Sequence, residues 1–108
     1  MRLKDIAETF RRDLQDPEFI EGYLQEALDD GIPSFLIALS DVAKANQGIG
    51  KLALETNSSR ESLYRTLSEE GNPYFTTIDK ILGSFGMRLA IMKKAHPFEE
   101  GHLPAREE

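Results

Sequence analysis

The stretch GKLALETNSSRESLYRTL, residues 50–67, decides the fold of this chain. Its apolar spacing predicts a short amphipathic helix, a tight turn and a second short helix. Ala53 lies on the inner face of the first helix and is small where the second helix has to cross closely. Asn57 falls at the reversal, and Asn is the commonest residue after Gly to accept a left-handed backbone. Leu63 and Leu67 face inward from the second helix, so we expect a helical hairpin with a shared apolar interior.

Two adjacent serines are candidates for the N-cap of the second helix. Ser58 with Glu61 has the spacing of a capping box, in which each side chain satisfies a backbone N–H of the other residue. Ser59 is an N-cap residue type that can act on its own. Both alternatives begin the helix close to residue 59.

The outward face of the second helix is rich in hydrogen-bond donors. Arg60 and Arg65 each offer a guanidinium fork that fits a guanine edge or a phosphate, and serine hydroxyls hydrogen-bond phosphate oxygens. This layout predicts a helix-turn-helix, whose second helix enters the DNA major groove. The alternative is an ordinary helical hairpin with a solvated outer face. The predicted DNA-binding residues are Lys51, Ser58, Ser59, Arg60, Glu61, Ser62, Tyr64, Arg65 and Thr76.

The chain also resembles a known family. Five stretches carry the likeness: SRESLYR at 59–65, EGNP at 70–73, GMRL at 86–89, FIEGYLQEAL at 19–28 and FLIAL at 35–39. Through them, residues 15–92 resemble the addiction-module antidote proteins, which are HigA-like antitoxins of the Xre, lambda-repressor-like superfamily. In that superfamily the turn position is usually Gly, whereas here it is Asn57, and Ser58 stands where an apolar residue is more usual.

The resemblance implies an antitoxin of a type II toxin–antitoxin module that binds operator DNA, represses its own operon and neutralises a small basic toxin of the RelE/ParE kind. Two acidic surfaces suit such a toxin electrostatically, residues 13–30 and the tail from Glu99. We favour the former, with Phe19, Tyr23 and Glu26 as toxin-binding residues, because ordered apolar side chains there can join the contact. The alternatives are a stand-alone phage-type regulator and a protein-interaction scaffold that has lost DNA reading.

Charge is unevenly distributed along the 108 residues. The formal net charge is −6 overall, made up of −6 in residues 1–43, +3 in residues 44–94 and −3 in residues 95–108. Affinity for nucleic acid rests on neutralised phosphates. The one basic part of the chain contains the helical hairpin, which supports a DNA-facing side and an acidic remainder for another partner.

The remaining pattern predicts an all-α fold of five to six short helices, with a single domain at 1–92 and a flexible acidic tail at 93–108. Helices are expected at 1–15, 17–30 and 32–46, and another begins at Asn72-Pro73. Residues 87–92 alternate with a period of two, which predicts a short strand. A lone strand is unstable. It therefore pairs with the same strand of a second copy, making a homodimer through Met87, Leu89 and Ile91, or it packs on its own domain.

No pattern in the sequence indicates catalysis, a metal site or a cofactor. The absence of cysteine excludes disulfides and thiolate metal sites. Both histidines, His96 and His102, lie in the tail outside any structured set of ligands. No apolar run approaches the roughly 20 residues that span a bilayer, and the N-terminus lacks the apolar core of a secretion signal. We expect a cytoplasmic protein that is no enzyme and binds neither a membrane nor a metal.

Overall fold

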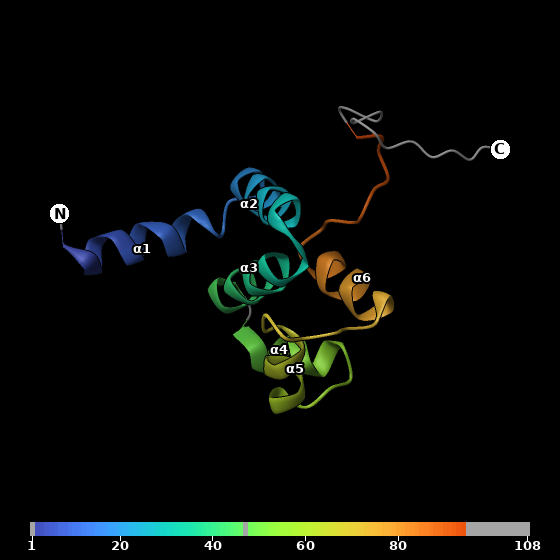
Figure 1. Ribbon diagram of the computed structural model, residues 1–108. Coiled ribbons are helices and arrows are strands. Elements are labelled where there is room, and N and C mark those ends of the chain that lie inside the picture. Colours follow the sequence, from blue (N-terminus) through green and yellow to red (C-terminus); the bar gives the residue numbers. More distant parts are fainter. Residues whose placement is uncertain (1, 47, 95–108) are drawn as a thin grey trace.

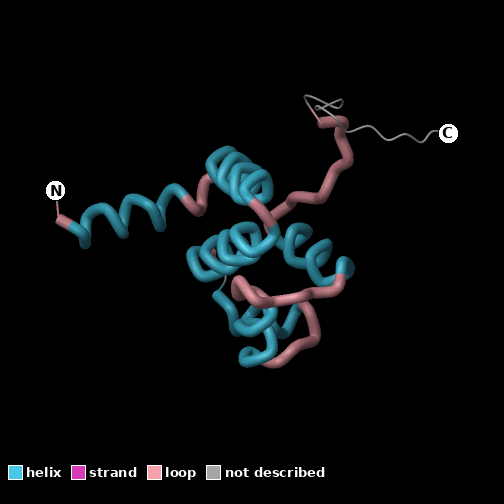
Figure 2. Tube along the Cα trace, viewed as in Figure 1, coloured by secondary structure: helices cyan, strands magenta, loops and turns pink. Residues whose placement is uncertain are grey.

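The computed structural model describes residues 2–46 and 48–94, and this part of the chain consists of helices and loops (Figures 1 and 2). The central helix α3 has α2 on one side, α4 and α5 on the other, and α6 alongside (Figure 1). The predicted all-α class is confirmed. The helix bounds are α1 Leu3–Asp13, α2 Pro17–Asp30, α3 Ile32–Ala45, α4 Gly48–Glu55, α5 Arg60–Thr66 and α6 Phe75–Ser84.

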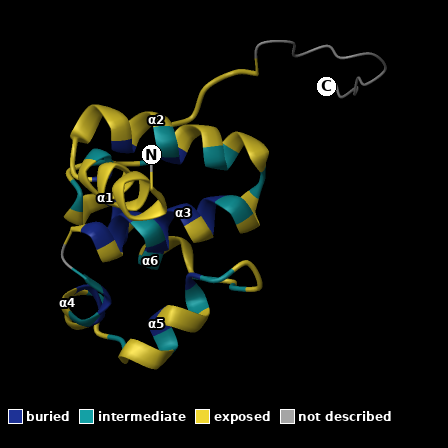
Figure 3. Ribbon diagram, turned by 90° about the vertical axis from the view of Figure 1, so that its left-hand side faces the viewer, coloured by how far each residue is buried: buried dark blue, intermediate teal, exposed yellow. Residues whose placement is uncertain are grey.

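One hydrophobic core joins α2 to α6, and α3 supplies more of its buried apolar side chains than any other helix (Figure 3). α2 begins where the sequence predicted, with Pro17 in its first turn and the Asp16 carboxylate accepting a hydrogen bond from the Glu18 backbone N–H at 3.2 Å. Gly31, with a φ of 144°, ends α2 and leads into α3. The largest fully buried side chains are Leu36, Leu39, Val42, Leu52, Leu63 and Ile81.

Side-chain amides fasten the end of α1 to the end of α3. The Asn46 amide donates to the carbonyl of Leu14 at 2.8 Å and to that of Val42 at 2.7 Å. The Gln15 amide donates to the carbonyl of Ala45 at 2.8 Å. The last carbonyls of a helix have no partner within the helix, so the bonds to Leu14 and Ala45 satisfy such carbonyls and join the end of α1 to the end of α3.

α1 projects from the body of the molecule (Figure 1). Its apolar residues have the spacing that the sequence predicted, yet no residue within the helix is buried. Leu3, near its free end, is 83% exposed. Burial begins only after the helix, at Leu14. The helix is therefore present as expected, but within the described part of this chain its apolar face is covered only near its end, at Phe10.

Residues 87–94 form no strand in the single chain, so the predicted strand is wrong for the isolated molecule. A strand needs ladder hydrogen bonds from a neighbour, and residues 2–46 and 48–94 contain no other strand to supply them. The alternation of period two still has a structural consequence. Met87 and Leu89 are partly buried against the core, whereas Arg88 and Ala90 are exposed. The segment therefore packs on its own domain, and a single chain does not test its pairing with a second copy.

The loop before α6 is longer than the sequence suggested, because α6 begins at Phe75 and not at Asn72-Pro73. A Cβ atom on Gly71 would lie 1.9 Å from the carbonyl oxygen of Thr66. The Gly71 N–H donates to the carbonyl of Ser68 at 2.8 Å. The glycine of the EGNP stretch thus packs against the end of α5, and α6 begins only after this stretch, at Phe75. Within the described ranges, no helix has the length and apolar content to cross a membrane.

Candidate nucleic-acid interface

The turn between α4 and α5 is a helix C-cap built around Asn57. Asn57 adopts the predicted left-handed conformation, with a φ of 56°. Its N–H donates to the carbonyl of Leu54 at 3.2 Å, and the Ser58 N–H donates to that of Ala53 at 2.8 Å. These two bonds form the Schellman pattern, which commonly ends a helix and usually has Gly at the left-handed position. Asn57 therefore takes the part that Gly plays in related turns.

Ser59 is the N-cap of α5. It has an extended backbone, and its Oγ accepts a hydrogen bond from the Ser62 N–H at 3.0 Å. Ser58 belongs to the end of the preceding helix, and its Oγ donates to the carbonyl of Thr56 at 3.3 Å. The structure therefore selects Ser59 acting alone over the capping box of Ser58 with Glu61. Glu61 lies in the first turn of α5, where a carboxylate interacts favourably with the positive end of the helix dipole.

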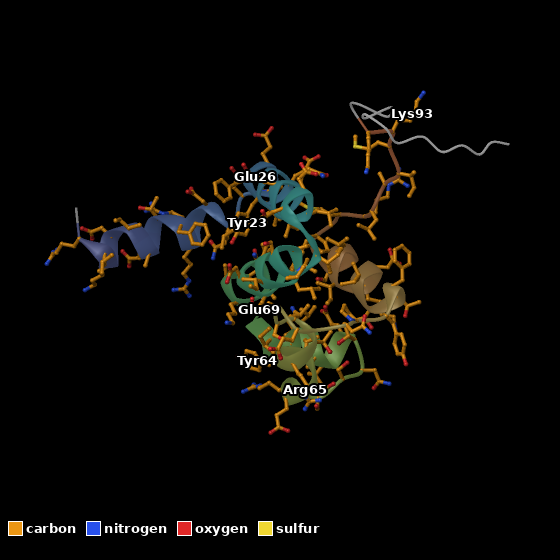
Figure 4. All side chains as sticks on the ribbon, viewed as in Figure 1. Tyr23, Glu26, Tyr64, Arg65, Glu69 and Lys93 are labelled. Carbon is orange, nitrogen blue, oxygen red and sulfur yellow. The ribbon has the colours of Figure 1, made fainter. Side chains whose placement is uncertain are left out.

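Both arginines of α5 are exposed, above a fully buried inner face. Leu63 and Leu67 pack into the core as predicted, and α5 lies against α4. Arg65 lies at the end of the molecule away from α2 (Figure 4). The burial that the sequence predicted for this helix is confirmed: the leucines face inward, and both arginines are exposed residues.

The Arg60 guanidinium lies across the first turn of α4. A Cβ atom on Gly50 would lie 2.6 Å from Nη2 of Arg60, so the missing side chain at Gly50 provides the space that the guanidinium occupies. This contact joins the beginnings of α4 and α5 into one surface. Lys51, the next residue of α4, is exposed beside it in sequence.

Tyr64 carries a contact that the sequence did not reveal. Its half-exposed ring lies under Lys44 of α3, with the Lys44 Nζ 5.7 Å from the ring centroid. An ammonium over an aromatic face is attracted by the ring's quadrupole. The contact places an additional cation beside α5. Because the two residues are twenty positions apart, no local pattern could have signalled it. We call Lys44, Lys51, Arg60 and Arg65 the basic surface; all four side chains are exposed.

Two further predicted DNA-binding residues, Ser62 and Thr76, are less closely associated with the basic surface. Ser62 is partly exposed, and its backbone N–H is engaged by the Ser59 cap. Thr76 is exposed in the first turn of α6. Among residues 2–46 and 48–94, no hydrogen bond joins Thr76 to α5. The structure therefore groups the predicted residues of α4 and α5 and leaves Thr76 on a separate element.

Two of the predicted toxin-binding residues, Tyr23 and Glu26, lie on the half of the molecule opposite Arg65 (Figure 4). Phe19 and Tyr23 stack with ring centroids 6.0 Å apart, and the ring of Phe10 meets both edge-on at 6.4 and 5.6 Å. Tyr23 also donates a hydrogen bond to the Asp41 carboxylate at 2.8 Å. Burial, reinforced by this hydrogen bond and by the negative charge of Asp41, raises the pKa of Tyr23 to about 12. Glu26 is exposed and borders the same shallow hollow as Tyr23.

Comparison with known proteins gives the family. A family model described as "Probable addiction module antidote protein" matches residues 5–93. A protein of Haemophilus influenzae described as uncharacterized is 36% identical over 90 residues, which cover 82% of this chain and 88% of the relative. No solved structure matches. The chain therefore belongs to the family of probable addiction module antidote proteins, and an antidote of this kind implies a toxin as its partner in general terms.

Proposed function

We propose that this chain is the DNA-binding antitoxin of a type II toxin–antitoxin module, which neutralises a small basic toxin of the RelE/ParE kind and represses its own operon. The observation that carries the DNA-binding part is the basic surface on and around α5. Two exposed guanidinium groups stand on a helix whose inner leucines are fully buried. Such a helix can enter a groove without losing its packing on the core.

On this proposal α5 lies in the major groove of double-stranded operator DNA. Its first turn meets the base edges, as in other helix-turn-helix proteins, and Arg60 stands at the first position of that turn. Lys44 and Lys51 come from the two helices before α5, and cations at the margin of a recognition helix contact phosphates. Arg60 then supplies sequence discrimination, whereas the lysines supply register and affinity.

A homodimer is part of the proposal. Operators read by helix-turn-helix proteins are usually near-palindromic, and two-fold dimers place two recognition helices on the two half-sites. A single copy of the seven-residue α5 contacts few base pairs. Two copies double the readable sequence.

The toxin is proposed to bind the flank of α2 that carries Phe19, Tyr23 and Glu26. α2 contains five acidic and no basic side chains, which complements a basic partner. Exposed aromatic surface at Phe19 adds apolar contact to the charge attraction. The proposed activities are both binding, and none of them requires the chain to be an enzyme.

A gel-shift titration on the DNA upstream of the chain's own gene tests the DNA-binding part. Arg60→Ala and Arg65→Ala are each expected to weaken binding by about 1–3 kcal/mol, and Arg60→Ala should relax specificity at the base it contacts. Arg12→Ala, an exposed arginine on α1, is the matched control and should leave binding unchanged. Lys44→Ala should weaken binding similarly on all sequences and lower the salt dependence by about one phosphate contact.

The outcomes separate the two activities. If wild-type chain fails to bind this DNA at low salt but still captures the product of the adjacent open reading frame, the chain is an interaction scaffold. Exposed Glu55 and Glu61 on the two hairpin helices favour that alternative. If the chain binds DNA and has no toxin gene beside its own, the stand-alone regulator is the better description.

A further inference from the structure

An apolar groove runs along the flank of α2 opposite Phe19 and Tyr23. It has a volume of about 620 Å³, and no segment of residues 2–46 or 48–94 fills it. Its apolar walls include Leu24 and Leu28 of α2, Leu82 of α6, and Met87 and Leu89 of the segment that follows. Glu18 and Glu21 of α2 and Arg88 of the segment after α6 stand exposed at its edge, so its rim carries a net negative charge.

The same chain carries an apolar helix face on α1 that is covered only near the end of the helix. Leu3, Ile6 and Phe10 recur at helical spacing on one side of this 11-residue helix, and all three are exposed, although the ring of Phe10 also packs against Phe19 and Tyr23. Isolated helices shorter than about 12–15 residues are marginal in water. A helix of this length therefore needs contact along its apolar face, and its own body supplies contact only near its last turn.

The net charges beside the two apolar surfaces are opposite in sign, because Glu18 and Glu21 outnumber Arg88 at the groove. Lys4 and Arg11 are seven residues apart and so lie on the same side of α1, next to the apolar face. Glu18 and Glu21 border the groove. Opposite charges at the edges of two apolar surfaces favour one orientation of docking over others.

α1 does not reach the groove of its own molecule. It ends at Asp13, and α2 begins at Pro17. The ring of Phe10 already packs against Phe19 and Tyr23, on the other flank of α2. A helix anchored on one flank and tethered by three residues does not cross to the opposite flank, so the partner has to be another molecule.

We propose that the apolar face of α1 docks in the α2 groove of a second copy of this chain, and that the second copy's α1 fills the first groove in return. Each chain has one such helix and one such groove, so a two-fold pair satisfies both and closes. Met87 and Leu89 then belong to the dimer interface as walls of the groove, and no strand pairing is needed. The pairing does not depend on DNA or on a toxin.

Sedimentation velocity of the full chain over a range of concentrations, without DNA, tests this pairing. Wild type is expected to form a dimer. Leu3→Ser with Ile6→Ser removes four apolar side chains from each dimer, so its dissociation constant should rise by about 100-fold or more. Both positions are exposed in the single chain, so the fold should remain. Leu54→Ser, at an 82% exposed leucine of α4, is the matched control and should leave the dimer unchanged.

Charge reversal distinguishes this interface from any other. Lys4→Glu with Arg11→Glu should weaken the dimer about tenfold, and adding Glu18→Lys with Glu21→Lys should restore it, because the rim pairs are then reversed together. A wild-type monomer at every concentration would mean that another partner covers both surfaces, and would overturn the proposal. A dimer that the Leu3 and Ile6 substitutions leave intact would also overturn it. So would a variant with all four charges reversed whose dimer is as weak as that of the variant with only Lys4 and Arg11 reversed.

Discussion

α1 and α5 are both short amphipathic helices, yet only α5 buries its apolar face. Leu63 of α5 is 1% exposed, whereas Leu3 of α1 is 83% exposed. α5 packs on α4 and is closed at its far end by the EGNP loop, whereas α1 is attached only where it joins α2 and α3. The difference teaches that apolar spacing specifies a helix and a face, but the arrangement of the other elements decides whether the same chain covers that face.

The largest expected effect compares the two faces directly. Leu63→Ala should lower the free energy of unfolding by about 2–5 kcal/mol, because the cavity lies in a closed core. Ile6→Ala on α1 should change it by no more than about 0.5 kcal/mol at concentrations where the chain is monomeric, since the side chain is exposed. Urea denaturation followed by circular dichroism measures both. Equal costs would mean that α1 packs on the body in solution.

Two glycines sharpen the comparison at the level of the backbone. Gly71→Ala places a Cβ atom 1.9 Å from the Thr66 carbonyl oxygen, so the loop must move, and we expect a loss of about 1–3 kcal/mol. Gly22 in α2 has no neighbouring atom within 4 Å of an added Cβ. Gly22→Ala should therefore stabilise the protein by about 0.5–1 kcal/mol through helix propensity. Opposite signs in the same denaturation experiment are expected; a loss at both positions would contradict the packing described for Gly71.

Helix capping gives a smaller contrast. α5 is capped by Ser59, whereas the residue before α1, Arg2, makes no side-chain cap. Ser59→Ala should cost about 1 kcal/mol. Ser58→Ala removes two long hydroxyl contacts, both to Thr56 and both at 3.3 Å, and should cost clearly less. If Ser58→Ala proved the more costly change, the capping box would be restored as the correct assignment.

Residue preferences and spacing within short stretches of sequence were sufficient to predict the helical hairpin of α4 and α5. Residue preference at Asn57 predicted the turn, and leucine spacing predicted the buried face of α5, because both depend on neighbours within one or two helical turns. The sequence also suggested the outward arginines, since they follow from the buried leucines. The N-cap of α5 remained open because Ser58 and Ser59 both fit the residue preference for an N-cap. Only the backbone hydrogen bonds show that Ser58 belongs to the end of α4.

Contacts between distant residues were not predictable in this way. The approach of Lys44 to Tyr64 and of Arg60 to Gly50 depends on how α3, α4 and α5 cross. The alternation at residues 87–92 suggested a strand because a period of two is typical of an extended backbone. It does not show whether a neighbouring strand is present to supply the hydrogen bonds of a sheet. The start of the last helix at Phe75, two residues after the expected Asn72-Pro73, depends on how the preceding loop packs on the end of α5.

The smallest expected effect concerns the root of α1, where Tyr23 packs against Phe10. Tyr23→Phe keeps the ring and removes only the hydrogen bond to Asp41. We expect a loss of about 0.5–1 kcal/mol near neutral pH, typical of one partly exposed hydrogen bond. Urea denaturation of wild type and variant in parallel measures it.

The pH dependence of that difference identifies its cause. The pKa of Tyr23 is raised from 10.0 to about 12 in the folded chain, first by burial and then by Asp41. Because the folded pKa is the higher one, the stabilisation by Tyr23 is complete below pH 10 and is lost as the pH rises towards 12. The wild type should therefore lose its advantage over Tyr23→Phe in that alkaline range and nowhere below it. If the stability difference between wild type and Tyr23→Phe instead disappeared at mildly acidic pH, a carboxylate would be its cause. The packing of α1 on α2 would then depend on Asp41 more than on the Tyr23 hydroxyl.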